Sequence, residues 1–473
     1  MPDAEFAALL QRATVAPALR AGVAALAEHA PLAATFGGTD ARRRIEAIIG
    51  ELDRVIAAQL DLVLHHPEFQ QVEASWRGLR FLVGSTETGP TLKIRLLDIG
   101  KRELARSLRK FRGTAWDQSP LFRRVYEEEY GQFGGEPFGV LVGDYFFDQR
   151  PEDVQLLADI AQVAAAAHVP FIAAAAPSVM QMESWAELAN PRDLSRIFLT
   201  PEYAAWRSFR DGEDARYIGL CLPRFLARLP YGARTEPADG FDFEEDVEGP
   251  DARRYLWANA AYAMAANIAR AFSLYGWCVR IRGIDGGGAV AGLPVLTFAT
   301  ADGDVDRRCS IEVALSERRE AELARNGFIP LVHRRGEDCA AFIGAQSLQR
   351  PQEYSDPAAT ANAALAARLP YLFACCRFAH YLKCMVRDKI GSARDRGQLQ
   401  NWLTAWLRGY IDGSPDDSTE QWKASHPLIE AEVTVESRED LPGQYEARFF
   451  LRPHFQLEGL TAALRLVSRL PAQ

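Results

Sequence analysis

The sequence is poor in cysteine and has no long apolar run, and each shortage excludes a class of protein. Seven cysteines in 473 residues form an odd set without the spacing of a disulfide framework, so we expect reduced thiols in a cytoplasmic chain. The most weakly polar run, 163–177, is interrupted by His168 and Pro170 and is too short to span a bilayer. The first residues, MPDAEFAALL, lack the basic and apolar regions of a signal peptide. We therefore expect a soluble protein with no direct membrane insertion.

Positive charge and catalytic motifs are also scarce. Lysine and arginine total 54 against 63 acidic residues, a net charge of -9, which argues against a general nucleic-acid surface. The chain contains no G-x-S-x-G elbow, no H-E-x-x-H, no P-loop and no kinase motif set. The sequence thus predicts a protein that is not an enzyme and that binds no nucleic acid and no cofactor.

One glycine-rich string imitates a dinucleotide site. Residues 286–291 (GGGAVA) satisfy G-x-G-x-x-A after a predicted strand. A dinucleotide site needs a helix next, because the helix N-terminus holds the pyrophosphate. Here Gly292 and Pro294 lead into another strand, so the string predicts a turn that needs positive φ.

Cys376, His380 and Cys384 recur every four residues and would share one face of a helix. This spacing can present soft metal ligands. The rest of the sequence supplies no obvious fourth ligand, and cysteine is among the residues most often buried. We interpret the three residues as core and predict no metal site.

The composition that remains, 48% hydrophobic and 25% charged, is that of a folded protein large enough for two or three domains. Strand, helix and strand at 139–144, 151–167 and 169–175 predict a βαβ unit with parallel pairing. Further strands are predicted at 92–97, 277–284, 293–299, 311–315 and 328–333. Helices are predicted at 40–65, 252–275, 357–368, 371–390 and 397–411.

The predicted fold is mixed α/β in three parts. Residues 1–60 form an N-terminal helical arm, and residues 61–350 form a mixed α/β body that contains the βαβ unit. Residues 351–473 form a C-terminal helical unit that ends in a β-hairpin.

The terminal hairpin is the most informative feature. Residues 444–456 (QYEARFFLRPHFQ) alternate apolar and polar side chains, and residues 463–470 (ALRLVSRL) alternate again. A two-stranded hairpin is marginal by itself, and its edges present unpaired backbone groups. We expect it either to dock on an earlier sheet or to take strands from another molecule, which would indicate an assembly protein.

Several long strings carry a resemblance to a known family. They are HHPEFQQVEASWRGLRFLV (65–83), GQFGGEPFGVLVGDYFFD (131–148), LPRFLARLPYG (222–232), YGWCVRIRGIDGGG (275–288), FIGAQSLQRPQEYSDP (342–357), RFAHYLKCMVRDKIGS (377–392) and FFLRPHFQLEGL followed by LRLVSRLP. In this order they resemble the large subunit of the type VI secretion system contractile sheath, the TssC/VipB family. The similarity extends from about residue 50 to residue 471.

The resemblance implies an assembly function. Members of the family pair with a small sheath subunit (TssB/VipA-like) and stack with other copies of themselves into a six-fold helical sheath on a baseplate. The sheath surrounds an inner tube of hexameric rings and contracts to propel tube and spike out of the cell. An AAA+ ATPase then disassembles the contracted sheath.

The resemblance also suggests roles for particular residues. Inter-subunit strand pairing would use the hairpin residues Phe449, Leu451, Phe455, Leu464, Leu466 and Val467. ATPase recognition would use the helix Phe6–Leu26, with Phe6, Leu9 and Leu10. A helical face with Lys383, Arg387 and Lys389 is a candidate inner-tube contact, with a salt-bridged surface as the alternative. The other functions considered are a sheath subunit of a related phage-tail-like contractile device and, from a different class, a nucleotide-dependent enzyme.

Overall fold

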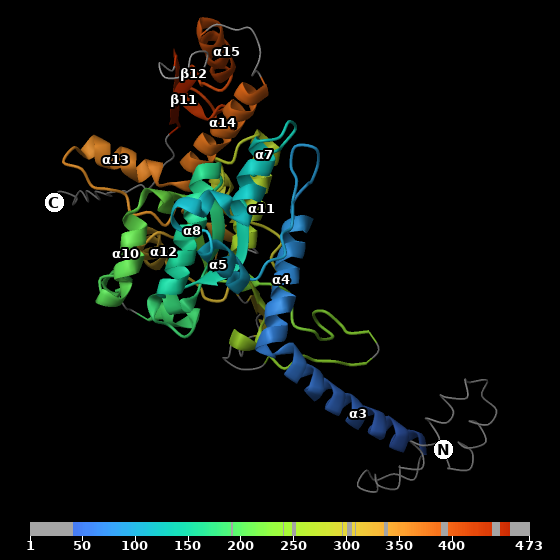
Figure 1. Cartoon of the computed structure of the whole chain (residues 1–473). Coiled ribbons are helices and arrows are strands. Elements are labelled where there is room, and N and C mark those ends of the chain that lie inside the picture. Colours follow the sequence, from blue (N-terminus) through green and yellow to red (C-terminus); the bar gives the residue numbers. More distant parts are fainter. Residues whose placement is uncertain are drawn as a thin grey trace, which may run out of the picture.

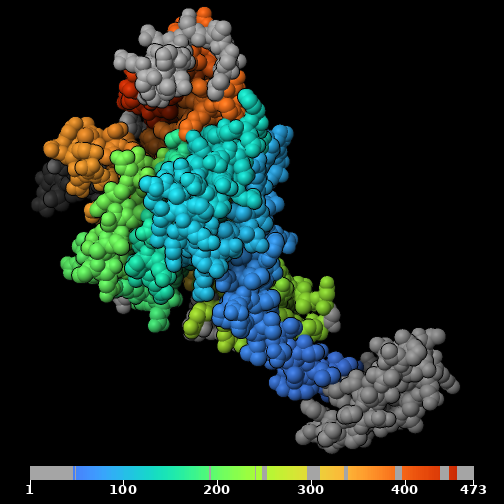
Figure 2. All heavy atoms as spheres, viewed as in Figure 1, coloured from blue at the N-terminus to red at the C-terminus, as the bar shows by residue number. Residues whose placement is uncertain are grey.

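The computed structural model describes residues 41–190, 193–239, 241–247, 252–295, 297–299, 305–307, 309–334, 339–388, 396–437 and 445–454. The described chain has a mixed α/β body, a helix α3 (Ala41–Leu64) that leads away from it, and a C-terminal unit at the far end (Figure 1). The packed atoms show the same division (Figure 2). The predicted fold class is confirmed.

The body is built on a six-stranded sheet with the order β1-β2-β3-β9-β10-β6. Its strands are β1 (Leu141–Phe147), β2 (Phe171–Ala175), β3 (Ile218–Leu222), β9 (Phe328–His333), β10 (Ala340–Phe342) and β6 (Ala289–Val290). The first four are parallel, whereas β10 is antiparallel to both β9 and β6. The central strands β2 and β3 are buried along their whole length, as is typical of parallel strands covered on both faces.

The predicted βαβ unit is confirmed: helix α8 (Pro151–Ala167) connects β1 to β2, which pair in parallel. Alternation along β2 separates two cores. Ile172 packs in a cluster with α11 (Ala260–Tyr275), whereas Phe171 and Ala173 pack in a second cluster with α8. Helix α11 begins where the Asn259 side chain accepts the N–H of Ala261 and ends at Gly276, whose φ is 75°.

The other long helices cover the body or form the C-terminal unit. They are α4 (Pro67–Gly84), α5 (Lys101–Arg109), α10 (Ala204–Asp211), α12 (Glu317–Arg325), α13 (Pro357–Ala366), α14 (Leu369–Asp388), α15 (Arg396–Arg408) and α16 (Glu420–Ser425), with the short turns α6 (Pro120–Phe122), α7 (Glu128–Tyr130) and α9 (Leu194–Ile197). Small two-stranded sheets are formed by β4 (Phe225–Leu226) with β5 (Trp257–Ala258) and by β7 (Thr297–Ala299) with β8 (Val305–Arg307). The C-terminal unit carries β11 (Leu428–Ser437) and β12 (Tyr445–Pro453).

Three predicted strands are wrong. Residues 92–97 and 277–284 form no strand, and 311–315 contributes one bridge, between Ile311 and Phe225. The apolar side chains of these segments pack on clusters from irregular backbone, for example Trp277 and Val279 beneath the C-terminal helices. Alternate burial in a connector thus imitates the period of a strand.

Candidate assembly site

The first strand of the predicted terminal hairpin is observed and pairs with an earlier strand, whereas its predicted partner, 463–470, lies outside the described residues. The predicted strand at 444–456 is observed as β12, and β12 pairs antiparallel with β11 over its whole length, from Leu428 opposite Pro453 to Ser437 opposite Tyr445. Of the two alternatives expected from the sequence, pairing with an earlier part of the chain holds for β12. The missed strand carried a usable pattern, because Ala431, Val433 and Val435 alternate with glutamates and a threonine.

The two faces of this hairpin differ in chemistry. Phe449 and Leu451 pack, with Val433 and Val435 of β11, on the cluster formed by α14 and α15. Arg448 pairs with Glu436 at 3.4 Å and Arg452 with Glu430 at 3.5 Å on the opposite face. Phe450 lies among these charges and is 54% exposed. In the described chain, β11 and β12 form a sheet of two strands, so each presents one edge without a neighbouring strand.

A polar clamp fixes the base of the hairpin. The N–H of His454 donates to Pro427 O at 3.0 Å, and the His454 Nε2 lies 3.0 Å from His426 O and 3.6 Å from Asp412 Oδ2. Burial lowers the pKa of His454, although the Asp412 carboxylate opposes this shift. Burial acts to raise the pKa of Asp412, but donation from Ser418 and Ser414 outweighs it and the net shift is downward. The clamp holds a buried carboxylate ionised at the point where the hairpin leaves the helices.

The hairpin packs in one apolar cluster with aromatic side chains that also contact the body. Trp277 follows α11 in the body, and its ring stacks on Phe378 of α14 at 4.2 Å between centroids. Tyr410 lies edge-on to both rings, at 5.2 Å and 5.7 Å. A force on the hairpin therefore passes through packed rings to the central body.

The predicted inner-tube cations have contacts within the chain. The Lys383 ammonium lies 5.2 Å from the ring centroids of Tyr126 and Tyr130. Arg387 donates to three backbone carbonyls at the end of α7, including Gln132 O at 2.8 Å. These contacts fit the alternative of an internally satisfied surface. Lys389 lies outside the described residues, as do Phe6, Leu9, Leu10, Phe455, Leu464, Leu466 and Val467.

The sequence analysis missed an apolar surface on α3 and α4. On α4, Phe69, Val72, Trp76 and Val83 are exposed at helical spacing, and Trp76 is 65% exposed. On α3, Leu62 is 70% exposed. On α3, Leu52, Val55 and Ile56 are also exposed, so the apolar face that its spacing predicts is not covered by the described chain. Several large exposed apolar side chains on neighbouring helices are typical of an interaction surface.

A buried ion network fixes the junction of these two helices to the body. Arg228 pairs with Glu245 at 2.5 Å and with Glu73 of α4 at 2.8 Å, and all three side chains are largely buried. His65, between α3 and α4, lies 3.3 Å from Glu245. Burial acts to lower the pKa of Arg228, but its hydrogen bonds and charge pairing with the two glutamates raise it overall. Charged groups that cannot easily separate thus hold α4 against the body next to its junction with α3.

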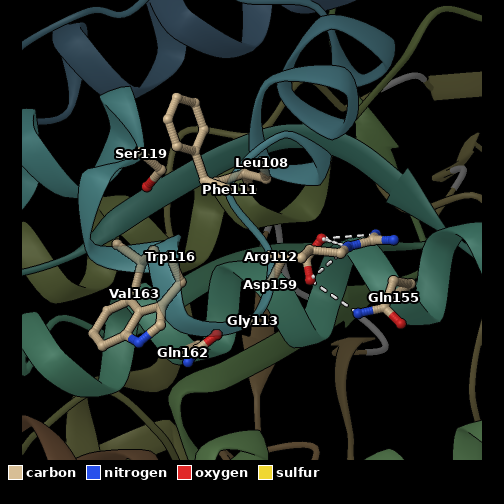
Figure 3. A pocket seen from close by; sticks show the side chains of 10 residues that line it. All are labelled: Leu108, Phe111, Arg112, Gly113, Trp116, Ser119, Gln155, Asp159, Gln162 and Val163. Atoms are coloured by element: carbon tan, nitrogen blue, oxygen red, sulfur yellow. Dashed lines mark hydrogen bonds and ion pairs between the residues drawn. The ribbon is translucent and has the colours of Figure 1, made fainter.

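A cavity of about 260 Å³ lies between α5, α8 and the turn that follows α5 (Figure 3). Arg112 donates to Asp159 at 2.8 Å, and Gln155 donates to the same carboxylate at 2.9 Å. The Ser119 hydroxyl accepts the N–H of Phe122 and serves as a helix cap. The lining residues therefore pair with one another and present no nucleophile next to a base.

The glycine-rich string forms a structural turn, as predicted. Gly287 has φ 89°, and a Cβ there would lie 2.3 Å from Arg280 O. Arg270 donates to Gly287 O and Ala289 O, both at 2.7 Å, so α11 occupies the carbonyls of the turn. Strand β6 follows, and no helix N-terminus faces the turn from that side.

On the cysteine and histidine face of α14, two of the three residues interpreted as core are buried, whereas Cys384 is partly exposed. Cys376 and His380 are buried, and the His380 Nε2 lies 2.9 Å from His168 O. Burial lowers the pKa of His380 to about 3 and that of His168 to about 4. Both rings are neutral near pH 7. Among the described residues, no group of three or more His, Cys, Asp or Glu side chains is arranged to hold a metal ion.

No helix in the described part of the chain combines the length and apolar character needed to cross a membrane.

Comparison with known proteins gives matches over almost the whole chain. Residues 46–349 match the family described as EvpB/VC_A0108, tail sheath N-terminal domain, and residues 358–470 match EvpB/VC_A0108, tail sheath gpW/gp25-like domain. The chain is 62% identical over 455 residues to the type VI secretion system sheath protein TssC1 of Pseudomonas aeruginosa, covering 96% of this chain and 91% of that protein.

Solved structures with a similar arrangement include two cryo-EM structures of injection systems. One is the anti-feeding prophage baseplate (10% identity, 80% of this chain and 83% of that chain, TM-score 0.40). The other is the PVC sheath complex in its contracted state (10% identity, 65% and 68%, TM-score 0.33). From the family matches and the TssC1 relative, the chain belongs to the VipB family of type VI secretion contractile-sheath large subunits.

Proposed function

We propose that this chain pairs with a small sheath subunit and polymerises with other copies of itself into a six-fold helical sheath around an inner tube. Contraction of that sheath propels the tube and its spike out of the cell, and a baseplate and an AAA+ ATPase complete the cycle. Family membership supports this function, and the identity to TssC1 favours it over a related phage-tail-like device. The chain acts as a structural element in the cytoplasm rather than as an enzyme.

The observation that carries the assembly mode is the two-stranded sheet β11–β12. A sheet of two strands is marginal, and strand addition supplies backbone hydrogen bonds that persist while side-chain contacts rearrange. The hairpin is anchored at its base and through Trp277, so a neighbour bound to its edge stays connected to the body. Residues 463–470 are the candidate strand for exchange between subunits, with Leu464, Leu466 and Val467 as pairing residues.

The test removes backbone donors from the exchanged strand. Leu466→Pro with Val467→Pro should leave the pair with the small subunit intact and abolish sheath tubules in electron micrographs. Leu466→Ile with Val467→Ile keeps the N–H groups and should assemble normally. Normal tubules from the proline variant would refute strand exchange at this segment.

We further propose that Phe6–Leu26, with Phe6, Leu9 and Leu10, is recognised by the disassembly ATPase. Deleting residues 6–26 should leave the sheath intact and abolish ATPase binding in a pull-down. Unchanged binding and disassembly would contradict the assignment. For the inner tube, Lys383, Arg387 and Lys389 remain the proposed contact, with Lys383 and Arg387 also held by contacts within the chain.

The division into an arm (1–60), a body (61–350) and a C-terminal unit (351–473) remains a proposal. The gap between the two matched family domains, from 349 to 358, supports the second boundary.

A further inference from the structure

Helix α5 presents a row of cations that the rest of the body does not neutralise. Its apolar residues Leu104 and Leu108 are buried, whereas Arg102, Arg106 and Arg109 are exposed and recur at intervals of four and three residues. The three arginines therefore share one face of the helix. Within the described ranges, their side chains form no ion pair and no hydrogen bond. Like charges at this spacing repel one another, so an anion bound along the row would stabilise it.

Cations at the two ends of the same segment do have partners. Lys101 donates to the Asp153 carboxylate at 2.6 Å, and Arg112 donates to Asp159 at 2.8 Å. Both carboxylates belong to α8, on which the buried leucines of α5 also pack. The carboxylates of α8 therefore neutralise the ends of the segment and leave the exposed row between them without an anion.

The opposite charge projects from another part of the surface. The described part of the loop between β4 and β5, drawn in yellow-green, extends beyond α4 and away from α5 (Figure 1, Figure 2). Asp239 and Asp242 are exposed on this loop, and neither side chain has an ion pair or hydrogen bond in the part of the chain that the structure describes. The base of the loop is fixed, because Glu245 is paired with the buried Arg228. Two unpaired aspartates are thus held out from the body on an anchored loop.

We propose that the arginine row of α5 binds Asp239 and Asp242 of a second copy of this chain. The inference rests on the proposed function, in which many copies repeat along one sheath. The two surfaces lie on different parts of one chain, so a contact between them is head-to-tail and extends through successive copies into a ring or a helix. The chain itself supplies both charges of the contact, whereas its net charge of -9 disfavours a nucleic acid on the same row.

Charge reversal in the full chain, co-purified with the small subunit, tests this contact. Arg106→Glu with Arg109→Glu should leave the pair with the small subunit intact and raise the critical concentration for sheath assembly about tenfold, because like charges then face each other. Adding Asp239→Lys and Asp242→Lys to the same chain restores opposite charges between copies and should return the critical concentration close to the wild-type value. Sedimentation and electron microscopy of the assembled sheath measure both effects.

Two further variants separate the contact from effects on folding. Arg106→Gln with Arg109→Gln removes the charges, keeps residues of good helix propensity and should raise the critical concentration about threefold. The matched control is Arg318→Glu with Arg325→Glu on α12, where both arginines are exposed. Arg325 ends α12 as Arg109 ends α5, so the control carries the same cost at a helix C-terminus and should assemble normally.

Normal assembly of both α5 variants overturns the inference. A charge swap that restores nothing also overturns it, because the arginine row then has a partner other than this loop. An equal loss of assembly in the α12 control does the same, since the effect is then not specific to α5. Absence of any sheath from the wild-type chain and the small subunit contradicts the proposed function instead.

Discussion

The body and the C-terminal hairpin use aromatic side chains in opposite ways. In the body, Phe328 is fully buried and stacks near Trp206 and Phe198. On the hairpin, Phe450 stands among charged residues and is half exposed. The Phe328 site is thus complete within one chain, whereas the hairpin and the α3–α4 surface leave apolar side chains exposed, which we propose another chain covers. The difference separates residues that specify the fold from residues that specify assembly.

The largest expected loss of stability follows from a substitution in the core of the body. Phe328→Ala should lower the free energy of unfolding by about 3–5 kcal/mol, because it removes a fully buried ring and leaves a cavity. Phe450→Ala should change it by less than about 0.5 kcal/mol. Urea unfolding followed by tryptophan fluorescence measures both. Similar losses for the two variants would show that the hairpin ring is part of the fold rather than of an interface.

Disrupting the buried ion network around Arg228 should cause the next largest loss of stability. Arg228→Ala leaves the buried Glu245 without its arginine partner, while Glu73 keeps Arg77, and should cost about 3 kcal/mol. Arg228→Met combined with Glu245→Leu removes both charges and should recover part of that loss. The same urea experiment compares them, and a double variant less stable than Arg228→Ala would refute the explanation.

Acid should weaken the body through His380 and His168. Burial lowers the pKa of both rings in the folded state, to about 3 and about 4, so the unfolded chain binds more protons below pH 6.5. Stability is therefore full above pH 6.5 and falls as pH decreases, by about 1.4 kcal/mol per pH unit for each histidine between pH 6 and pH 4. His380→Gln should reduce this slope in urea titrations at several pH values. An unchanged slope would show that His380 is not a source of the pH dependence of stability.

The smallest effect on stability should accompany a large effect on assembly. Trp76→Ser changes an exposed side chain of α4 and should alter the free energy of unfolding by less than about 0.5 kcal/mol. If the α3–α4 surface is an interface, the same variant should reduce co-purification of the small subunit. Normal co-purification would remove α4 from the proposed contact surface.

The sequence predicted those elements of the body whose local residue pattern matches their burial in the fold. The βαβ unit was found because β2 is continuously apolar and α8 has clear limits. Strand β3 was missed, because a five-residue apolar run between irregular segments has no periodicity that distinguishes it from a connector. The resemblance of long strings identified the family before any geometry was known.

The assembly surfaces were predictable only in part. Alternation identified β12 and the inward side of Phe449 and Leu451, but the alternation of the preceding strand β11, with which β12 pairs, was not recognised. Lys383 and Arg387 looked free in sequence because their partners, Tyr126, Tyr130 and Gln132, lie about 250 positions earlier in the chain. The exposed face of α4 required burial to be known residue by residue.

The most direct test of the central claim is a cryo-EM structure of the sheath that this chain forms with its small subunit. The account predicts that β11–β12 lies within a larger sheet completed by strands from neighbouring subunits. A β11–β12 sheet that still has two strands in the assembled sheath would contradict it.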